Sequence, residues 1–217
     1  MVTEDQACEL LLPFGLQLTS EQIAKLLTYL DLLMRWNTKI NLTAIRSPEE
    51  CITRHFGESL YLARFVELKG SLLDIGSGAG FPGLALMIAF PRLQVTLLEP
   101  VGKKRAFLKD VARLCEVLQS VRIRPERLDE FLLSSIGSAQ FEAATSRAVG
   151  GLRELIPNAV RCLKPNGCVF LWLSQDQGQE AVAAGRDLID WTDPIPIPLA
   201  RQRQIWCGRR INGRGGS

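Results

Sequence analysis

The segment from Asp74 to Gly83 contains four glycines and follows directly on the short apolar run 71–75. Such a run is typical of a strand buried in a parallel sheet. The glycines allow the chain to turn sharply where the strand ends, and they let a ligand approach the backbone closely. A strand, a glycine-rich turn and the start of a helix form the ligand-binding unit of doubly wound α/β domains. The segment therefore predicts an α/β fold with its ligand at the end of the first strand.

After residue 70 the chain alternates between strand-like and helix-like patterns. Strands are expected at 71–75, 94–99, 121–124, 141–146, 168–173, 195–199 and 203–209, the proline-broken segment 195–199 lying at an edge. Helices are expected at 81–90, 103–118 and 152–163. Strands that alternate with helices predict a doubly wound sheet with helices on both faces.

The N-terminal third has helical patterns only. Thr19 and Gln22 form a capping box ahead of apolar residues spaced three and four apart. A second helix is expected to start at Ser47-Pro48 and to run through His55 towards Val66. We therefore expect a helical extension over residues 1–69 and a sheet domain over residues 70–217, which together form one structural unit.

The charge of the chain is distributed unevenly. The 217 residues carry 26 basic and 23 acidic side chains, and the resulting net charge of +3 is too small to argue for a polyanionic partner. Residues 92–127, however, hold nine basic groups against four acidic ones, and residues 201–217 hold five arginines and no acid. Arginine is well suited to phosphate recognition, so these segments are candidates for contact with an anion.

The cysteine and histidine content bears on metal binding and on location. Six cysteines without metal-ligand spacing and a single histidine argue against a zinc site. No apolar stretch reaches the ~18 residues needed to span a bilayer, and the first thirty residues lack the pattern of a signal peptide. We expect a cytoplasmic protein without metal or membrane partner, for which nothing requires more than a monomer.

The spacing of the glycines favours one class of cofactor. Dinucleotide-binding domains use G-x-G-x-x-G, whereas here the third glycine is Gly80 and Phe81 occupies the place that this pattern requires. The order Asp74-x-Gly76-x-Gly78-x-Gly80 instead resembles the first motif of S-adenosyl-L-methionine-dependent methyltransferases. Asp74 then faces the methionine end of the cofactor. Glu99, which closes the second strand, is placed to accept hydrogen bonds from the ribose hydroxyls, although NAD-binding proteins have a carboxylate there too.

Missing motifs narrow the reaction. The acid-Pro-Pro-aromatic motif that accompanies methylation of exocyclic amines is absent after the fourth strand, where the chain has Thr145-Ser146-Arg147-Ala148. No Pro-Cys pair occurs, so the cysteine nucleophile of cytosine C5 chemistry is missing. These absences leave an acceptor that is already nucleophilic, or a different substrate.

Several further segments carry a more specific resemblance, which runs from about Leu30 to Gly167. The chain resembles the bacterial small-subunit ribosomal RNA guanine-N7 methyltransferases, also called the glucose-inhibited division protein B family. The segments that carry the resemblance are Trp36-Asn37-Thr38-Lys39-Ile40-Asn41-Leu42-Thr43-Ala44-Ile45, His55 to Leu60, Asp74 to Gly83, Lys103-Lys104 with Phe107-Leu108, and Ser146-Arg147-Ala148.

The resemblance implies a seven-stranded, Rossmann-like methyltransferase sheet and a defined reaction. The family transfers a methyl group from S-adenosyl-L-methionine to N7 of a guanine in the 530 loop of 16S rRNA, at position 527. The partner would then be 16S rRNA or the small ribosomal subunit. N7 has a free lone pair, so no proton needs to be removed before attack. A site without a general base is therefore expected.

The resemblance also assigns residues. Gly76 and Phe81 would line the cofactor site, Leu128 and Asp129 would flank the adenine, and Glu99 matches the ribose-binding acid. Arg147 would lie beside the methyl-transfer region, as a catalytic and cofactor-contacting residue. The predicted cofactor-binding set is Asp74, Gly76, Gly78, Gly80, Phe81, Glu99, Leu128, Asp129 and Arg147.

Other polar and aromatic residues have competing interpretations. Lys103, Lys104 and Arg105 begin a helix, where positive charge is unfavourable, and this makes them candidates for RNA binding. His55 is interpreted as a structural residue of its helix. Trp36 can stack on a base, but its place beside an apolar helix face favours core packing.

The chain departs from the family pattern at several places. Glu58 stands where Asp is usual, Pro100 where Ser is commoner, and Leu173-Ser174 where the family has Lys-Gly. The part after Gly167 matches poorly. Two alternatives therefore stay open, an inactive RNA-binding protein that kept the cofactor fold and a methyltransferase for small molecules. The substrate can be naked RNA, an assembly intermediate or the finished subunit.

Overall fold

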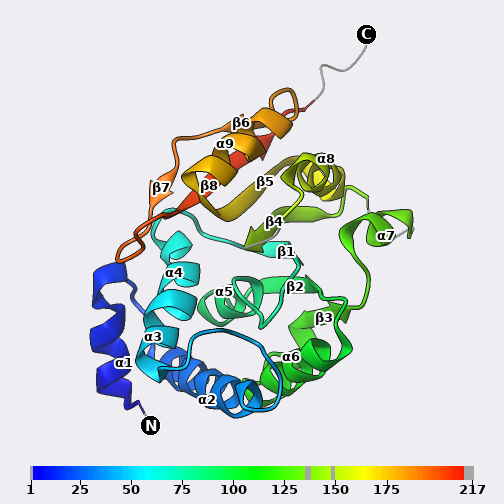
Figure 1. The fold of residues 1–217 in the computed structure, drawn as a ribbon. Helices are drawn as coiled ribbons and strands as arrows, with labels where there is room; N and C mark the ends of the chain where they lie inside the picture. The colour runs from blue at the N-terminus through cyan, green and yellow to red at the C-terminus, as the bar shows by residue number, and fades with distance from the viewer. Residues whose placement is uncertain (1, 135–137, 148–149, 213–217) are drawn as a thin grey trace.

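The centre of the molecule is a mixed sheet, seen in a computed structural model that describes residues 2–134, 138–147 and 150–212 (Figure 1). The sheet has eight strands in the order β3-β2-β1-β4-β5-β8-β6, with β7 paired to β8. Strands β1 to β5 pair in parallel, and the last three pair antiparallel at one side. The strand bounds are Gly70–Ile75, Leu93–Leu98, Val121–Arg124, Phe141–Arg147, Leu163–Ser174, Ile189–Trp191, Ile195–Pro196 and Arg203–Arg210.

The doubly wound α/β class predicted from the sequence is confirmed, with one more strand in the described part of the chain than the seven expected. The additional strand is β6, Ile189–Trp191, whose three residues are too short for an alternating pattern to be recognised. The segment expected at 195–199 is reduced to the two residues of β7, since Pro196 and Pro198 lack the N–H that ladder pairing requires.

Helices α5 to α9 alternate with the strands and have the bounds Gly83–Ala89, Gly102–Leu114, Leu128–Leu133, Leu152–Cys162 and Gln175–Ala184. Helix α5 starts two residues later than expected, because residues 81–82 still belong to the glycine loop. Helix α6 ends four residues before the expected Leu118, because Glu116 adopts a left-handed conformation with φ 59°. Helices α7 and α9 were not expected, although Ser174 and Gln177 form a capping box at the start of α9.

The segment before the sheet is helical, as expected. Helix α1 (Glu4–Leu11) and helix α2 (Ser20–Asn37) both begin with a capping box. Helix α3 (Pro48–Cys51) continues through the π-helical turn Ile52–Gly57 into α4 (Glu58–Leu60). A π-helical turn widens the helix and changes the direction of its side chains, and such turns are frequent at functional sites.

The sheet has a separate apolar core on each face. Helices α2, α5 and α6 pack with alternate residues of β1 and β2, for example Leu72 and Val95, in the first core. Helices α7, α8 and α9 pack with the intervening residues, for example Leu73 and Leu98, in the second core. Residues of α1 to α4 belong to the first core together with the strands. The division at residues 69 and 70 stays a prediction, and β1 begins at Gly70.

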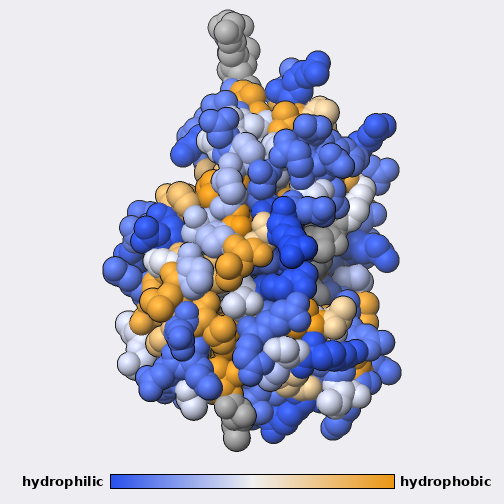
Figure 2. All heavy atoms as spheres, turned by 60° about the vertical axis from the view of Figure 1, so that its left-hand side comes forward, coloured by the Kyte–Doolittle hydropathy of each residue, from blue (hydrophilic) through white to orange (hydrophobic). Residues whose placement is uncertain are grey.

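The side of the molecule that carries the N-terminal helices has a mixed surface. Apolar atoms gather on the left half of the face shown in Figure 2, among hydrophilic ones. In the N-terminal third, Leu12 and Phe65 are exposed, at 72% and 51%. Within the described ranges no helix is both long and apolar enough to cross a membrane.

The packing of α9 against β8 generates a stability prediction. A Cβ added at Gly178 would overlap the indole ring of the buried Trp206. Gly178→Ala is therefore expected to lower the free energy of unfolding by about 1–3 kcal/mol, measured by urea denaturation. Helix propensity alone predicts the opposite sign, a gain of about 1 kcal/mol. Gln179→Ala, at an exposed position of the same helix, is the control, and a stabilised Gly178→Ala variant would contradict the packing.

Candidate active site

The glycine loop between β1 and α5 is held from the side of β2 by one carboxylate. Gly76, Gly78 and Gly80 have φ values of 70°, 56° and 88°, in the region that glycine adopts without strain. The backbone N–H of Gly78 donates to Glu99 Oε2 at 2.9 Å, and that of Val101 donates to Glu99 Oε1 at 2.8 Å. Glu99 is 3% exposed, so its two oxygens join the loop to the end of β2 in a buried environment.

The same loop is held from the side of α2 by an aromatic side chain. The hydroxyl of Tyr29 donates to the backbone carbonyl of Ala79. Its ring stacks on Phe81 with centroids 5.1 Å apart and an interplanar angle of 7°. A Cβ at Gly80 would collide with the Tyr29 hydroxyl, so both the left-handed backbone and the close approach require glycine there. Sequence reasoning missed Tyr29, although a Tyr on an apolar helix face usually directs its hydroxyl at a buried acceptor.

Asp74 lies beneath the loop. It is fully buried, and Oδ1 accepts a hydrogen bond from Thr145 Oγ1 at 2.8 Å. A Cβ at Gly83 would lie 2.6 Å from the Asp74 Cβ, so the start of α5 packs directly on this residue. Burial raises the pKa of the Asp74 carboxyl to about 6, against the opposing effect of the Thr145 hydrogen bond. The carboxyl thus supports the loop from below.

A cavity of about 310 Å³ opens at the carboxyl ends of β1 and β2. Open α/β sheets bind their ligands at this edge, and the volume is at the lower end of the range for small-molecule sites, roughly 300–1,000 Å³. Of the predicted cofactor residues, Gly76, Leu128 and Asp129 line this cavity. The other lining residues are Ile75, Leu98, Pro100, Glu126, Arg127, Gly150, Gly151, Glu154, Leu155 and Asn158.

Arg147, at the end of β4, takes part in a buried ion cluster and is not among the residues that line this cavity. Its guanidinium lies 3.4 Å from Glu58 Oε2 and donates to the backbone carbonyl of Arg54 at 2.7 Å. Arg203 donates to both oxygens of Glu58, at 2.8 and 2.7 Å. Burial lowers the pKa of Arg147 to about 10, so the side chain still carries its charge at neutral pH. Two arginines thus share one carboxylate that is 2% exposed.

A wider cavity of about 720 Å³ adjoins this cluster and is lined by Glu58, Trp172, Ser174 and three arginines, Arg54, Arg201 and Arg203. The two residues that depart from the family at the end of β5 have structural contacts here. Leu173 is buried in the second core, and Ser174 caps α9. Ala148 of the predicted Ser-Arg-Ala motif lies outside the described residues.

His55 and Trp36 pack as expected. His55 stacks on Phe81 at 4.8 Å between ring centroids, and its Nε2 lies 2.7 Å from Thr43 Oγ1. Burial lowers the pKa of His55 to about 3, so the imidazole is neutral. Trp36 packs edge-on against Phe107 at 5.9 Å.

The Asn-Leu-Thr segment that follows α2 is organised by the last residue of that helix. The side-chain oxygen of Asn37 accepts from the N–H groups of Leu42 and Thr43, both at 3.0 Å. Its amide group donates to the carbonyls of Thr43 and Ile45 at 3.0 and 3.3 Å. This explains why Asn stands at the end of α2 and brings Thr43 to His55.

The three basic residues at the start of α6 differ in their contacts. Arg105 donates to the carbonyls of Glu99 and Pro100 at 2.9 and 2.6 Å, and so fixes the chain just after β2. Lys103 is exposed and Lys104 is half-buried, and neither forms an ion pair with another described residue. In the ranges that the structure covers, no three His, Cys, Asp or Glu side chains group so as to hold a metal ion.

The sheet order, the glycine loop and the carboxylate that ends β2 are those of the S-adenosylmethionine-dependent methyltransferase fold. A predicted O-methyltransferase from Agrobacterium tumefaciens superposes with a TM-score of 0.59 over 72% of this chain and 82% of that one, at 16% identity. Geranyl diphosphate C-methyltransferase from Streptomyces coelicolor, solved with S-adenosyl-L-homocysteine, gives 0.60 over 84% of this chain and 98% of that one, at 14% identity.

The chain belongs to the GidB family, described as rRNA small subunit methyltransferase G, whose model matches residues 22–191. The ribosomal RNA small subunit methyltransferase G of Chloroflexus aggregans is 39% identical over 210 residues, which cover 94% of this chain and 88% of that protein. The protein of the same name from Xylella fastidiosa strain M23 is 43% identical over 158 residues, 71% of this chain and 70% of that protein. The resemblance predicted from the sequence is thereby confirmed.

The burial of Asp74 predicts a pH-dependent stability. A folded-state pKa of about 6 against an ordinary 3.8 favours the protonated form in the folded protein. The stabilising contribution is therefore present below about pH 4 and is lost as the pH rises through about 6. Asp74→Asn should gain stability relative to the wild type over that window, by up to about 3 kcal/mol. Urea denaturation at several pH values measures the difference, and Asp187→Asn, at an exposed position, is the control. A difference that is constant with pH would contradict the prediction.

The Tyr29 hydroxyl predicts a cofactor-affinity effect. Tyr29→Phe keeps the stack on Phe81 but leaves the buried Ala79 carbonyl without its donor. An unpaired buried group costs roughly 1–3 kcal/mol, which the loop can recover only by moving. We expect S-adenosylmethionine affinity to fall several-fold in calorimetry while the chain stays folded. Tyr61→Phe is the matched control, since Tyr61 packs on Phe14 and Phe65 and lies away from the loop. Equal affinities for both variants would rule out the hydroxyl as a support of the loop.

Proposed function

We propose that this protein transfers a methyl group from S-adenosyl-L-methionine to N7 of a guanine in the 530 loop of 16S rRNA. The observation that carries the proposal is family membership over residues 22–191, in combination with a glycine loop and a lined cavity at the ligand-binding edge of the sheet. A ribosomal substrate implies a cytoplasmic enzyme, and the proposal requires only a monomer.

The residues around the 310 Å³ cavity fit the cofactor. Gly76 lines the cavity and Gly78 follows it in the same loop, and neither has a Cβ atom. Among the described residues, only the Gly76 carbonyl, at 3.9 Å, lies within 4 Å of the place of a Cβ on Gly78. Glu99, at the end of β2, is the carboxylate proposed to accept the ribose hydroxyls. Leu128 and Asp129 are proposed to flank the adenine from the start of α7. When bound, S-adenosylmethionine supplies an electrophilic methyl group on a sulfonium sulfur.

The protein's own groups are proposed to orient the acceptor and to exclude water. N7 of guanine attacks through a free lone pair, so the reaction needs alignment and no proton removal. His55 suits such a site, because it is neutral and tied to Thr43 and is therefore no candidate for a proton carrier. Arg147 is proposed to act beside the acceptor. Glu58 holds its guanidinium in place, and Arg54, Arg201 and Arg203 make the adjoining cavity cationic.

Lys103 and Lys104 are proposed to bind RNA phosphates. They stand at the start of α6, next to the end of β2 and so beside the cofactor cavity. Arg105 has a different proposed part, since its donors hold the backbone that precedes α6. Phosphate contacts of this kind make RNA affinity dependent on salt.

The function is tested with 16S rRNA from a strain that lacks the endogenous enzyme. Incubation of its small subunits, or of the naked rRNA, with the protein and cofactor is expected to produce 7-methylguanine in the 530 loop, detected by mass mapping. Glu99→Gln should weaken cofactor affinity about ten-fold, because its amide N–H₂ would face the N–H of Gly78 or Val101 and leave a buried donor unpaired. Glu67→Gln, at a surface ion pair, is the control. Cofactor binding without methyl transfer would instead support the inactive RNA-binding protein. Methyl transfer that does not depend on RNA or on salt concentration would support a small-molecule methyltransferase.

A further inference from the structure

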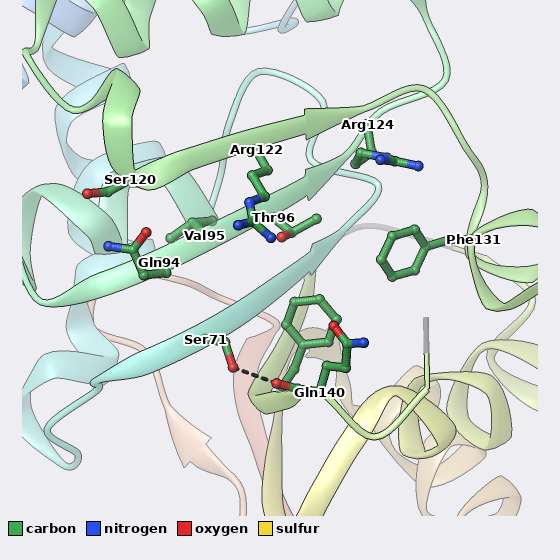
Figure 3. A pocket seen from close by; sticks show the side chains of 10 residues that line it. Ser71, Gln94, Val95, Thr96, Ser120, Arg122, Arg124, Phe131 and Gln140 are labelled. Carbon is green, nitrogen blue, oxygen red and sulfur yellow. Dashed lines mark hydrogen bonds between the residues drawn. The ribbon is translucent and has the colours of Figure 1, made fainter. Parts of the chain in front are cut away.

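A second cavity, of about 400 Å³, lies on the face of the sheet that carries α7, and it is distinct from the cofactor cavity (Figure 3). Its walls come from β1, β2 and β3, from the residues at the starts of β3 and β4, and from Phe131 of α7. Helix α8 packs over β4 and β5, whereas the six-residue α7 leaves much of the β1-β2-β3 half of this face uncovered. The lining residues are Ser71, Gln94, Val95, Thr96, Ser120, Arg122, Arg124, Phe131, Gln140 and Phe141.

The sequence of β3 explains why arginines face this cavity. In Val121-Arg122-Ile123-Arg124 the apolar residues pack against the first core, and the two arginines point to the opposite face. Strand β2 alternates in the same way, since Val95 and Leu97 belong to the first core while the side chains of Gln94 and Thr96 belong to neither core. All of these except Leu97 line the cavity. A strand buried on both faces would have apolar residues at these positions. The pattern thus keeps this half of the face polar.

The cavity is lined by several hydrogen-bond donors that have no acceptor among the described residues. Among the described residues, the side chains of Gln94, Thr96, Ser120, Arg122 and Gln140 form no hydrogen bond, and no acidic residue lines the cavity. Figure 3 shows the Arg122 guanidinium lying across β2 beside Thr96. Arg122 is exposed and, within the described ranges, has no acidic partner, in contrast to Arg124, which is paired with Glu126. Unused donors around an unpaired guanidinium suit an anion with several acceptor oxygens.

The position of the cavity connects it to the cofactor site. Arg124 lines the second cavity, and its ion-pair partner Glu126 lines the cofactor cavity. The guanidinium of Arg124 also lies 6.0 Å from the ring centre of Phe131, which holds it at the boundary between the two. The second cavity runs from the amino ends of the strands, at Ser71 and Gln94, to Arg124 at the carboxyl end of β3. An RNA with its target base at the cofactor cavity would reach Arg122 by following this face of the sheet past Arg124.

We propose that this cavity binds a phosphodiester group of the RNA substrate, with Arg122 as the principal contact and Arg124, Thr96 and Gln94 as supporting donors. The proposal rests on the RNA substrate of the proposed function and adds a second contact surface to it. Phosphate contacts fix the register of a nucleic acid without reading its bases. The cavity positions the RNA and takes no part in methyl transfer.

The test compares Arg122→Gln with Arg113→Gln, an exposed arginine of the same basic segment that lies on α6 and lines a different cavity. Binding of a labelled 16S rRNA fragment that contains the 530 loop is measured over a range of salt concentrations. Arg122→Gln is expected to weaken binding about three- to ten-fold and to lower the slope of log affinity against log salt by about 0.7–0.9. Its KM for RNA rises while kcat and S-adenosylmethionine affinity stay unchanged. Arg113→Gln leaves the slope unaltered.

A second variant tests the cavity without changing charge. Thr96→Val keeps the shape of the side chain and removes one donor beside Arg122, so a smaller loss of RNA affinity with an unchanged salt slope is expected. Inorganic phosphate, added without RNA, separates the sources of the anion: a free-phosphate site would show Arg122-dependent binding of phosphate by calorimetry.

The outcomes separate the two proposals. If the wild type methylates 16S rRNA and Arg122→Gln behaves as Arg113→Gln does, the cavity proposal is overturned and the proposed function stands. Tight Arg122-dependent binding of inorganic phosphate without an effect on RNA overturns it as well. If the wild type neither binds nor methylates 16S rRNA, the proposed function is overturned, and with it the cavity proposal that rests on it.

Discussion

The glycine loop between β1 and α5 is the backbone segment on which the rest of the site depends, and it has no stable geometry of its own. Three positive φ values within five residues cost conformational entropy, so other groups must hold the loop. In this loop the N–H of Gly78 donates to Glu99, and the carbonyl of Ala79 accepts from the Tyr29 hydroxyl. Asp74 packs against the start of α5, which follows the loop. These three supports come from β2, α2 and β1, so the geometry of the loop requires all three elements to be packed.

The N-terminal helices supply side chains that hold the glycine loop and the neighbouring residues in position. Helix α2 supplies Tyr29 to the loop and Asn37 to the segment that places Thr43 against His55. The π-helical turn between α3 and α4 directs Arg54 and His55, and α4 places Glu58, which holds Arg147 at the end of β4. The extension and the sheet thus share a core and share the site, because each contributes side chains that the other keeps in position.

How well the sequence predicted each feature depends on how far apart along the chain the interacting residues lie. Strands β1 and β2, the capped start of α2 and the glycine loop have local signals, and these predictions were confirmed. The family resemblance assigned Leu128 and Asp129 to the cofactor site, and both line the 310 Å³ cavity, while their contact with the cofactor stays a prediction. The partners of Arg147 were not predictable, because Glu58 and Arg203 come from residues far away along the chain on either side, and only packing brings them together. Asp74 was expected to face the cofactor, a role that stays a prediction, while its burial under the loop has no local signature.

The small net charge gives no sign that the basic residues fall into two groups, those with partners within the protein and those without. Arg105, Arg124, Arg147 and Arg203 each donate to backbone carbonyls or carboxylates of the protein itself, so part of their charge and hydrogen-bonding capacity is used within the fold. Within the described residues, Lys103, Lys104, Arg122 and Arg201 have no such partner. A paired cation contributes little to the attraction of a polyanion, because its field is cancelled nearby, so the unpaired ones decide where RNA binds. Lys103 and Lys104 lie next to the end of β2 and Arg201 lies beside the Glu58 cluster, whereas Arg122 lies on the open face of β3. The RNA is therefore expected to extend from the carboxyl ends of the strands over this face of the sheet.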